Sequence, residues 1–295
     1  MAELVDMVPV QNILGESPLW NPRDARLWWT DIQGRRLLRY DPVARTLDEI
    51  ATPERLCSFA FVAGSDRLIA AFESGLALYD PASGAVEWLY RLERGTAPIR
   101  FNDGRTDRQG RFWAGTMVEG EGREPLGRLY CLDRSGRVTC RPDHVLISNA
   151  LCTSPDGSLL YFADSPRRTI FVFDLDRSSG VLSNRRRFVK TPEGALPDGA
   201  NVDHEGFVWN AHWGAGRIVR YAPDGRIDRT VEVPASQPSC IAFGGPQMNL
   251  LFVTSARDGL RDDILLNQPS AGNLFVYQTD ITGLPDAEFV FEQAN

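Results

Sequence analysis

One strand–turn–strand pattern recurs six times along the chain and constrains its fold more than any other feature. Each unit pairs two short runs rich in aromatic and β-branched residues, bounded by Gly, Pro, Asp or Asn, which is typical of β-strands. The units are 41 to 48 residues apart, counted between Leu27, Leu68, Phe112, Leu160, Val208 and Leu251. Blades of a β-propeller, with four strands each, have this spacing. The sequence therefore predicts an all-β, six-bladed propeller of four antiparallel strands per blade, with residues 1–295 as a single domain.

The two ends of the chain are expected to close the ring. Strand-like segments lie near Leu4–Val10 and Glu288–Phe291. Because a closed ring leaves no sheet edge unpaired, we expect these two segments to complete one blade together.

Composition excludes several classes of partner. The formal net charge of -7 is unfavourable for binding a phosphate backbone, so no nucleic acid is expected. No stretch approaches the ~20 apolar residues of a membrane helix, and the first ten residues lack the basic charge of a secretory signal. The five cysteines are odd in number and lack C-x-x-C spacing, which indicates mostly buried free thiols and a reducing cytoplasm. A monomer or weak homo-oligomer is expected.

Strand parity gathers polar residues on one face of the ring. The starts of the innermost strands and the ends of the second strands share that face, here called the top, and loops on it are expected to carry function. Stepping back eight residues from the turn between these strands gives the same register in four repeats, at Glu16, Asn102, Asn149 and Asp198. In the other two repeats the register falls near Ser58 and Pro238.

Oxygen ligands that converge at a channel mouth suit a hard divalent cation. Two like charges such as Glu16 and Asp198 are costly there without a cation between them. Each residue alone has an ordinary alternative, because Asn and Asp often form Asx turns at strand starts. The absence of Cys and His from the set argues against a structural zinc site and favours Ca²⁺, Mg²⁺ or Mn²⁺, although Zn²⁺ as the catalytic ion stays open.

Other residues share this face. Arg100 lies two residues before Asn102 and so points to the same side of its strand. Glu119 begins an acidic, glycine-containing loop that also holds Glu121. Asp164 and His212 end second strands, where they serve as packed or capping residues as readily as catalytic ones. The chain has neither a G-x-S-x-G nucleophile elbow nor a phosphate-binding glycine loop.

Taken as a set, five motifs resemble the gluconolactonase and regucalcin (senescence marker protein) family of metal-dependent sugar lactonases. The motifs are LGESPLW (14–20), RFNDG (100–104), GRFWAGTM (110–117), SN (148–149) followed by SPDG (154–157), and PDG (197–199). The resemblance covers most of the chain. It implies a six-bladed propeller with one divalent metal ion on its top face.

By matching motifs, the resemblance implies that Glu16, Asn149 and Asp198 are metal ligands and that Arg100 and Asn102 contact sugar hydroxyl groups. It also implies a substrate-binding acid after the GRFWAGTM motif, for which Glu119 is our choice and Glu121 the alternative. His212 stands at a position where members of the family vary.

The favoured interpretation is hydrolysis of a sugar aldonolactone, similar to gluconolactone, xylonolactone or arabinonolactone, to the aldonic acid. A divalent ion would act as a Lewis acid, and Asp198 would accept a proton from the attacking water. Arg100, Asn102 and Glu119 would orient the sugar. Three alternatives remain open: a calcium-binding protein similar to regucalcin, a metal-free interaction scaffold, and a related phosphotriesterase or lactonase with a more hydrophobic top face.

Overall fold

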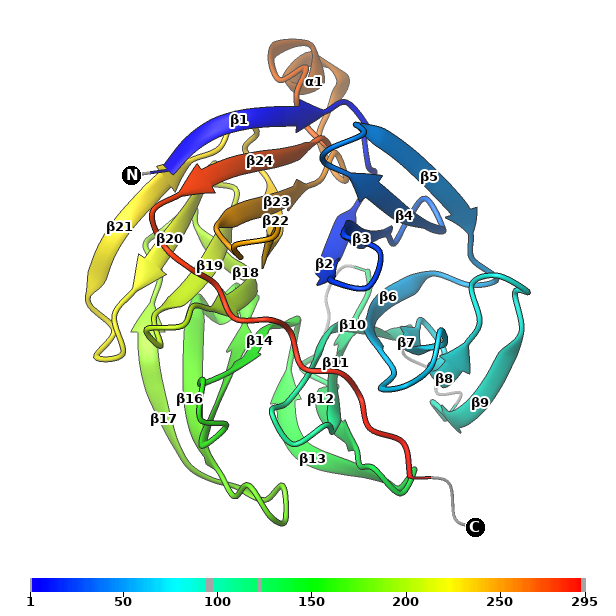
Figure 1. Ribbon diagram of the computed structural model, residues 1–295. Coiled ribbons are helices and arrows are strands. Elements are labelled where there is room, and N and C mark those ends of the chain that lie inside the picture. Colours follow the sequence, from blue (N-terminus) through cyan, green and yellow to red (C-terminus); the bar gives the residue numbers. More distant parts are fainter. Residues whose placement is uncertain (1, 94–97, 121–123, 293–295) are drawn as a thin grey trace.

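The computed structural model describes residues 2–93, 98–120 and 124–292. Six four-stranded antiparallel sheets are arranged in a ring (Figure 1). Successive innermost strands contact one another around the ring, and those of the first and last blades also contact, which closes it. The predicted six-bladed β-propeller is therefore confirmed.

Five blades consist of four consecutive strands, named here from the channel outwards. Blade one comprises β2 (Gly15–Asn21), β3 (Arg26–Asp31), β4 (Arg36–Asp41) and β5 (Thr46–Ala51). Blade two comprises β6 (Leu56–Phe61), β7 (Leu68–Phe72), β8 (Gly75–Tyr79) and β9 (Val86–Arg91). Blade three comprises β10 (Ile99–Thr106), β11 (Phe112–Val118), β12 (Gly127–Leu132) and β13 (Val138–Val145).

Blade four comprises β14 (Ser148–Thr153), β15 (Leu159–Asp164), β16 (Thr169–Leu175) and β17 (Leu182–Lys190). Blade five comprises β18 (Leu196–Val202), β19 (Val208–Trp213), β20 (Arg217–Tyr221) and β21 (Ile227–Glu232). Two short helices interrupt the described strands, η1 (Ser165–Arg167) after β15 and α1 (Asp262–Asn267) in blade six. Neither has the length and apolar character needed to cross a membrane.

Blade six combines both parts of the chain. It comprises β22 (Pro238–Gly244), β23 (Leu250–Ser255), β24 (Leu274–Thr279) and, as its outermost strand, β1 (Ala2–Val8). Because β1 pairs antiparallel with β24, the prediction that the N-terminal segment completes a blade is confirmed.

The prediction for the C-terminal segment, Glu288–Phe291, is wrong. Beyond β24 the chain crosses in front of the ring in Figure 1, over the hairpins that form the bottom face. Backbone hydrogen bonds tie Phe289 to Phe61 and Ala63 of blade two, and Val290 to Gly110 of blade three. The physical reason is that β1 already occupies the outer edge of β24, while the bottom face offers a buried site for Phe289, which is 0% exposed.

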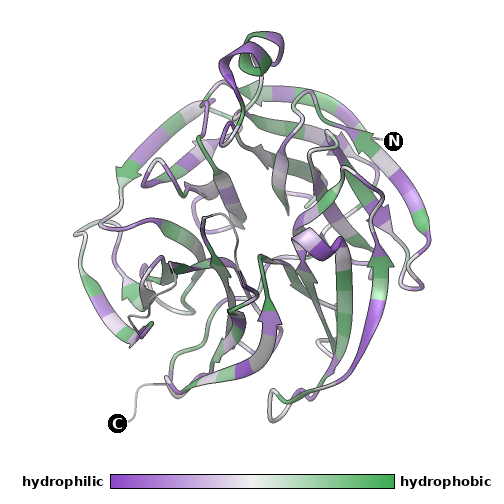
Figure 2. Cartoon of the chain, turned by 180° about the vertical axis from the view of Figure 1, so that it is seen from behind, coloured by the Kyte–Doolittle hydropathy of each residue, from purple (hydrophilic) through white to green (hydrophobic). Residues whose placement is uncertain are grey.

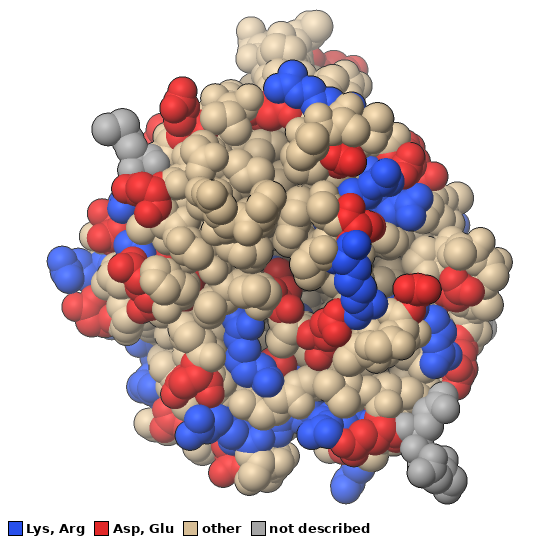
Figure 3. Space-filling view, in the orientation of Figure 1, with Lys and Arg blue, Asp and Glu red and all other residues tan. Residues whose placement is uncertain are grey.

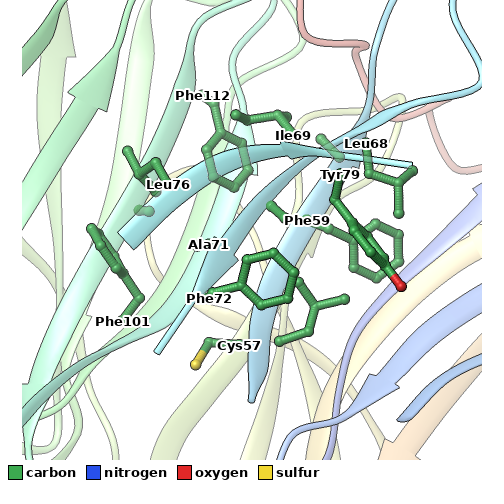
Figure 4. Close-up of a cluster of buried hydrophobic side chains, with 14 of the residues drawn as sticks. Cys57, Phe59, Leu68, Ile69, Ala71, Phe72, Leu76, Tyr79, Phe101 and Phe112 are labelled. Atoms are coloured by element: carbon green, nitrogen blue, oxygen red, sulfur yellow. The ribbon is translucent and has the colours of Figure 1, made fainter. Parts of the chain in front are cut away.

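The core lies between the blades, where their faces pack. Figure 4 shows one such cluster, in which Phe59, Phe72 and Tyr79 of blade two meet Phe101 and Phe112 of blade three. The inner three strands of blade two are buried on both faces, whereas the outermost strands carry hydrophilic and hydrophobic residues in turn (Figure 2). Dense packing of this kind fixes the positions from which the loops of the top face begin.

Acidic and basic side chains are interspersed on the bottom face, which Figure 3 shows. Arg23 pairs with Glu288 and Arg134 with Glu292, so part of this pattern comes from the C-terminal segment. All five cysteines are free thiols, as expected. Four of them are buried and Cys140 is exposed, in agreement with the expectation that most are buried.

Candidate active site

The innermost strand of every blade has a β-bulge or register shift in its first half. In β2 the shift lies between Glu16 and Leu19, in β14 between Asn149 and Cys152, and in β18 between Pro197 and Ala200. The strands β6, β10 and β22 have equivalent shifts. Bulges bend a strand and re-aim its side chains, and they are common beside active sites. They lie here at the register that the sequence singles out.

The backbone next to the three predicted metal ligands is constrained. Ser17 and Ala150, which follow Glu16 and Asn149, adopt left-handed φ angles of 52° and 56°. Such angles are uncommon for residues other than glycine and mark places where the surrounding structure imposes the conformation. Behind Asp198, a Cβ atom on Gly199 would lie 2.2 Å from the Sγ atom of Cys240. Only glycine therefore fits beside Asp198.

These bulges surround a cavity of about 320 Å³ at the mouth of the channel. Polar and apolar side chains both line it, and they come from blades one, three, four, five and six: Leu14, Glu16, Arg100, Asn102, Met117, Ile147, Asn149, Ser165, Leu196, Pro197, Asp198, Trp213 and Asp258. Five predicted residues thus meet in one cavity: Glu16, Arg100, Asn102, Asn149 and Asp198. Ser58 and Pro238, which mark the register in the other two blades, are buried and are not among the described lining residues.

A larger hollow of about 640 Å³ lies between blades one and two. Its two arginines are already paired, Arg23 with Glu288 and Arg39 with Asp48. The convergent polar groups that mark a binding site lie instead at the channel mouth.

A chain of hydrogen bonds joins the polar residues of the cavity. Nη1 of Arg100 donates to Oδ1 of Asn102 at 2.7 Å, and Nδ2 of Asn102 donates to Oδ1 of Asn149 at 3.0 Å. Nδ2 of Asn149 donates to Oγ of Ser165 at 2.8 Å, and this hydroxyl donates to the carbonyl oxygen of Pro197 at 2.7 Å. Since Pro197 precedes Asp198, the chain connects blade three to the backbone next to Asp198 in blade five.

Glu119 forms an ion pair with Arg100. Nε of Arg100 donates to Glu119 at 2.9 Å, while Arg55 donates to both oxygens of the same carboxylate, at 2.7 and 2.9 Å. Burial favours a higher pKa for Glu119, but the two arginines outweigh it and hold the pKa below its usual range. Glu119 is not among the described residues that line the cavity, and its alternative, Glu121, lies outside the described residues.

Burial and mutual repulsion oppose ionisation of the carboxyl groups at the cavity floor. Burial, followed by the charge of Asp103, raises the pKa of Glu16 to about 8. Burial, followed by the charges of Glu16 and Asp103, raises the pKa of Asp198 well above its usual value. Asp103 is itself buried, and its Oδ2 accepts a hydrogen bond from the Leu151 N–H at 2.7 Å. The positive charges of Arg100 and Arg105 offset this repulsion only in part, so protons or a bound cation would stabilise the carboxyl groups of the floor.

The donor set fits a hard divalent cation. The carboxylates of Glu16 and Asp198 and the amide oxygen of Asn149 are all oxygen donors, the type that Ca²⁺, Mg²⁺ and Mn²⁺ prefer. Within the described ranges, no group of three or more His, Cys, Asp or Glu side chains is arranged to hold a metal ion. The proposed ligand set has only two carboxylates, those of Glu16 and Asp198, and its third ligand is the amide oxygen of Asn149.

Asp164 and His212 occupy supporting positions. Asp164 accepts hydrogen bonds from the backbone N–H groups of Leu146 and Ile147, so it fixes the loop that precedes β14. Nε2 of His212 is 2.9 Å from the Tyr221 hydroxyl, and burial lowers the pKa of His212 to about 4. The imidazole is therefore neutral near pH 7 and packs against the Tyr221 ring.

Four site residues were missed from the sequence. Asp103 belongs to a quoted motif, but strand alternation assigns it to the opposite side from Asn102, and only the bulge in β10 alters this. Trp213 is the last residue of the second strand β19, and Ser165 directly follows the second strand β15, so their positions could have singled out both residues. Asp258 belongs to a longer loop with no sequence signal of its own.

Comparisons with known proteins identify the family. Residues 14–257 match the family model described as "SMP-30/Gluconolactonase/LRE-like region". The chain is 41% identical to an L-arabinolactonase from Azospirillum brasilense over 96% of this chain and 94% of that one. It is 33% identical to a 6-deoxy-6-sulfogluconolactonase from Pseudomonas putida over 94% and 95% of the two chains.

Among solved structures, it is similar to a regucalcin from Agrobacterium tumefaciens, described as a calcium-binding protein. The TM-score is 0.91 at 31% identity, covering 97% of this chain and 98% of that one. The chain therefore belongs to the SMP-30/gluconolactonase/LRE-like family, as the motifs of its sequence predict.

Proposed function

We propose that this protein is a metal-dependent lactonase that hydrolyses a sugar aldonolactone to the open-chain aldonic acid. The observation that carries the proposal is the chain of hydrogen bonds from Arg100 through Asn102 and Asn149 to Ser165. It couples groups suited to sugar hydroxyls with groups suited to a cation, within one cavity. The relatives named as sugar lactonases support the same reaction class.

Glu16, Asn149 and Asp198 would hold the cation. A divalent ion bound there supplies Lewis acidity for the lactone carbonyl and lowers the pKa of nearby water. The Asp198 carboxylate accepts the proton from the attacking water, since it is the ionisable group at the start of β18 that faces the cavity. The close approach of Cys240 to Gly199 leaves no room for a larger residue directly after Asp198.

Arg100 binds and orients the sugar. Its Nε and Nη1 atoms are held by Glu119 and Asn102, but no hydrogen bond from the described residues reaches Nη2. Because Arg100 lines the cavity, this nitrogen is available to a hydroxyl group of the substrate. Both N–H groups of the Asn102 amide are already used, on Ser148 and Asn149, so Asn102 meets a hydroxyl as an acceptor through Oδ1.

A calcium-binding role without turnover is the second candidate function. The all-oxygen donor set and the similarity to a structure described as a calcium-binding protein favour it. It predicts tight binding of Ca²⁺ and no acid release from any lactone.

One experiment separates these functions. The purified protein is stripped with a chelator, reloaded with Ca²⁺, Mg²⁺, Mn²⁺ or Zn²⁺, and assayed by acid release on a panel of pentono- and hexonolactones. The proposal predicts turnover of at least one lactone that is lost on chelation and restored by a divalent ion. Full activity after exhaustive chelation would contradict the metal-dependent mechanism, and no turnover with any ion would favour the calcium-binding role.

A further inference from the structure

Asp258 enters the cavity from blade six with its backbone fixed. Its N–H donates to the carbonyl oxygen of Ile13 at 2.9 Å, and its own carbonyl oxygen accepts a hydrogen bond from Nε2 of Gln237 at 3.0 Å. Two residues earlier, Ala256 forms an antiparallel bridge with Leu14, just before Glu16. The segment that carries Asp258 is therefore tied to the segment that leads to a predicted metal ligand.

The carboxylate of Asp258 remains available. It lines the cavity and is half-buried, yet within residues 2–93, 98–120 and 124–292 no hydrogen bond or ion pair reaches its side-chain oxygens. By contrast, Asp103 is bonded to a backbone N–H and Glu119 to two arginines. A fixed backbone with a free carboxylate is an arrangement suited to a ligand that donates hydrogen bonds.

The ring places Asp258 opposite Arg100. Blades three and six are separated by two blades on either side, and the ring is closed, so Arg100 and Asp258 face the cavity from opposite walls. The three predicted metal ligands come from blades one, four and five. A polyhydroxylated ring bound over them has the N–H donors of Arg100 on one side and a carboxylate acceptor on the other.

We propose that Asp258 determines substrate specificity, by accepting hydrogen bonds from sugar hydroxyl groups on the side opposite Arg100 and by repelling lactones that carry an anionic group there. This inference rests on the proposed lactonase function. A carboxylate can accept hydrogen bonds from two neighbouring hydroxyls at once, and it disfavours a sulfonate, phosphate or carboxylate through like-charge repulsion. The preferred substrates are therefore neutral aldonolactones.

The test compares a neutral lactone with a charged one on the same ring, glucono-δ-lactone and 6-phosphoglucono-δ-lactone. Steady-state constants are measured for the metal-loaded wild type, Asp258→Asn, Asp258→Glu and Asp258→Lys. Asp262→Asn, which removes an exposed carboxylate from the neighbouring helix α1, is the matched control. A thermal melt of each variant reports folding.

The wild type is expected to favour the neutral lactone. Asp258→Asn raises KM for that lactone roughly tenfold with little change in kcat, because a charge-assisted hydrogen bond is lost. It shifts the ratio of kcat/KM values towards the phosphorylated lactone, Asp258→Lys shifts it further, and Asp258→Glu and Asp262→Asn keep the wild-type preference. A ratio unchanged in Asp258→Asn and Asp258→Lys, in an enzyme that turns over lactones, overturns the role of Asp258 alone. A wild type that hydrolyses no lactone overturns the proposed function and this inference together.

Discussion

Nδ2 of Asn102 donates a hydrogen bond to Oδ1 of Asn149 at 3.0 Å, across the junction between blades three and four. The same Asn102 accepts a hydrogen bond from Arg100 at 2.7 Å. One carboxamide thus connects the residue proposed to bind sugar with a residue proposed to bind metal. Partners that orient a metal ligand influence affinity for the ion as well as catalysis.

The alanine variants of Arg100 and Asn102 should therefore differ in their effects on substrate binding and on metal affinity. Arg100→Ala should lower kcat/KM for a polyhydroxylated lactone by roughly 10- to 150-fold, through KM, and leave metal affinity nearly unchanged. Asn102→Ala should in addition weaken metal binding, by about tenfold or more, because Asn149 loses the donor that orients it. Isothermal titration with Mn²⁺ and steady-state kinetics measure both effects.

A simple lactone without ring hydroxyl groups is the control substrate for Arg100. Its hydrolysis should be affected less by Arg100→Ala than that of the sugar lactone. An equal loss on both substrates would contradict a role for Arg100 in binding hydroxyl groups, and equal metal affinity in Asn102→Ala and the wild type would contradict the coupling.

The raised pKa values of Glu16 and Asp198 predict how the metal-free protein responds to pH. A carboxyl group whose pKa is higher in the folded than in the unfolded state stabilises the fold while it is protonated, and this contribution is lost as pH rises through the folded value. For Glu16 that value is about 8, so stability should fall between mildly acidic pH and about pH 8. The melting temperature of chelator-treated protein across this range measures the effect.

A substitution and the addition of metal should each reduce this pH dependence. Glu16→Gln removes one of the two carboxyl groups with a raised pKa, and a bound divalent ion favours the ionised forms of both Glu16 and Asp198. A melting temperature that is independent of pH over the same range in the chelated wild type would show that the two carboxyl groups are not held protonated.

The C-terminal segment should contribute stability without contributing to catalysis. Phe289 is fully buried against the bottom face, and Phe289→Ala should lower the free energy of unfolding by about 3–5 kcal/mol. Its kcat at 25 °C should remain near the wild-type value, because the cavity opens on the opposite face. Denaturant unfolding and steady-state assays test this, with Glu288→Ala as the control because its ion pair with Arg23 is partly exposed and is expected to contribute little stability. A loss of kcat as large in Phe289→Ala as in a cavity variant would contradict the separation of the two faces.

The repeat made the fold predictable, because each blade consists of neighbouring strands whose pattern is local. The register of Glu16, Asn149 and Asp198 was predictable for the same reason, since turns at equivalent places in the blades fix equivalent strand starts. The bulge in β10 was not predictable from alternation, and it turns Asp103 towards the carboxylates of the floor.

Contacts between distant segments could not be found in the same way. Phe289 pairs with blade two, far earlier in the chain, and nothing in its sequence distinguishes that contact from strand pairing with β24. Asp258 lies in the loop between β23 and β24, which is longer than the equivalent loop in each of the other blades. Its position follows from hydrogen bonds to Ile13 and Gln237, and the bond to Ile13 forms only where blade six meets the segment that leads into blade one.

The most direct test of the proposed mechanism is kcat for Asp198→Asn at saturating divalent ion, measured on protein whose fold is checked by a circular dichroism melt. The substitution keeps the shape and one potential ligand oxygen but removes the negative charge and the proton acceptor. The account predicts an intact fold, a modest loss of metal affinity, and a decrease in kcat on the order of 10²–10⁴, as expected when a general base is removed. A kcat near the wild-type value would contradict the role of Asp198 as the base and leave it only as a structural ligand.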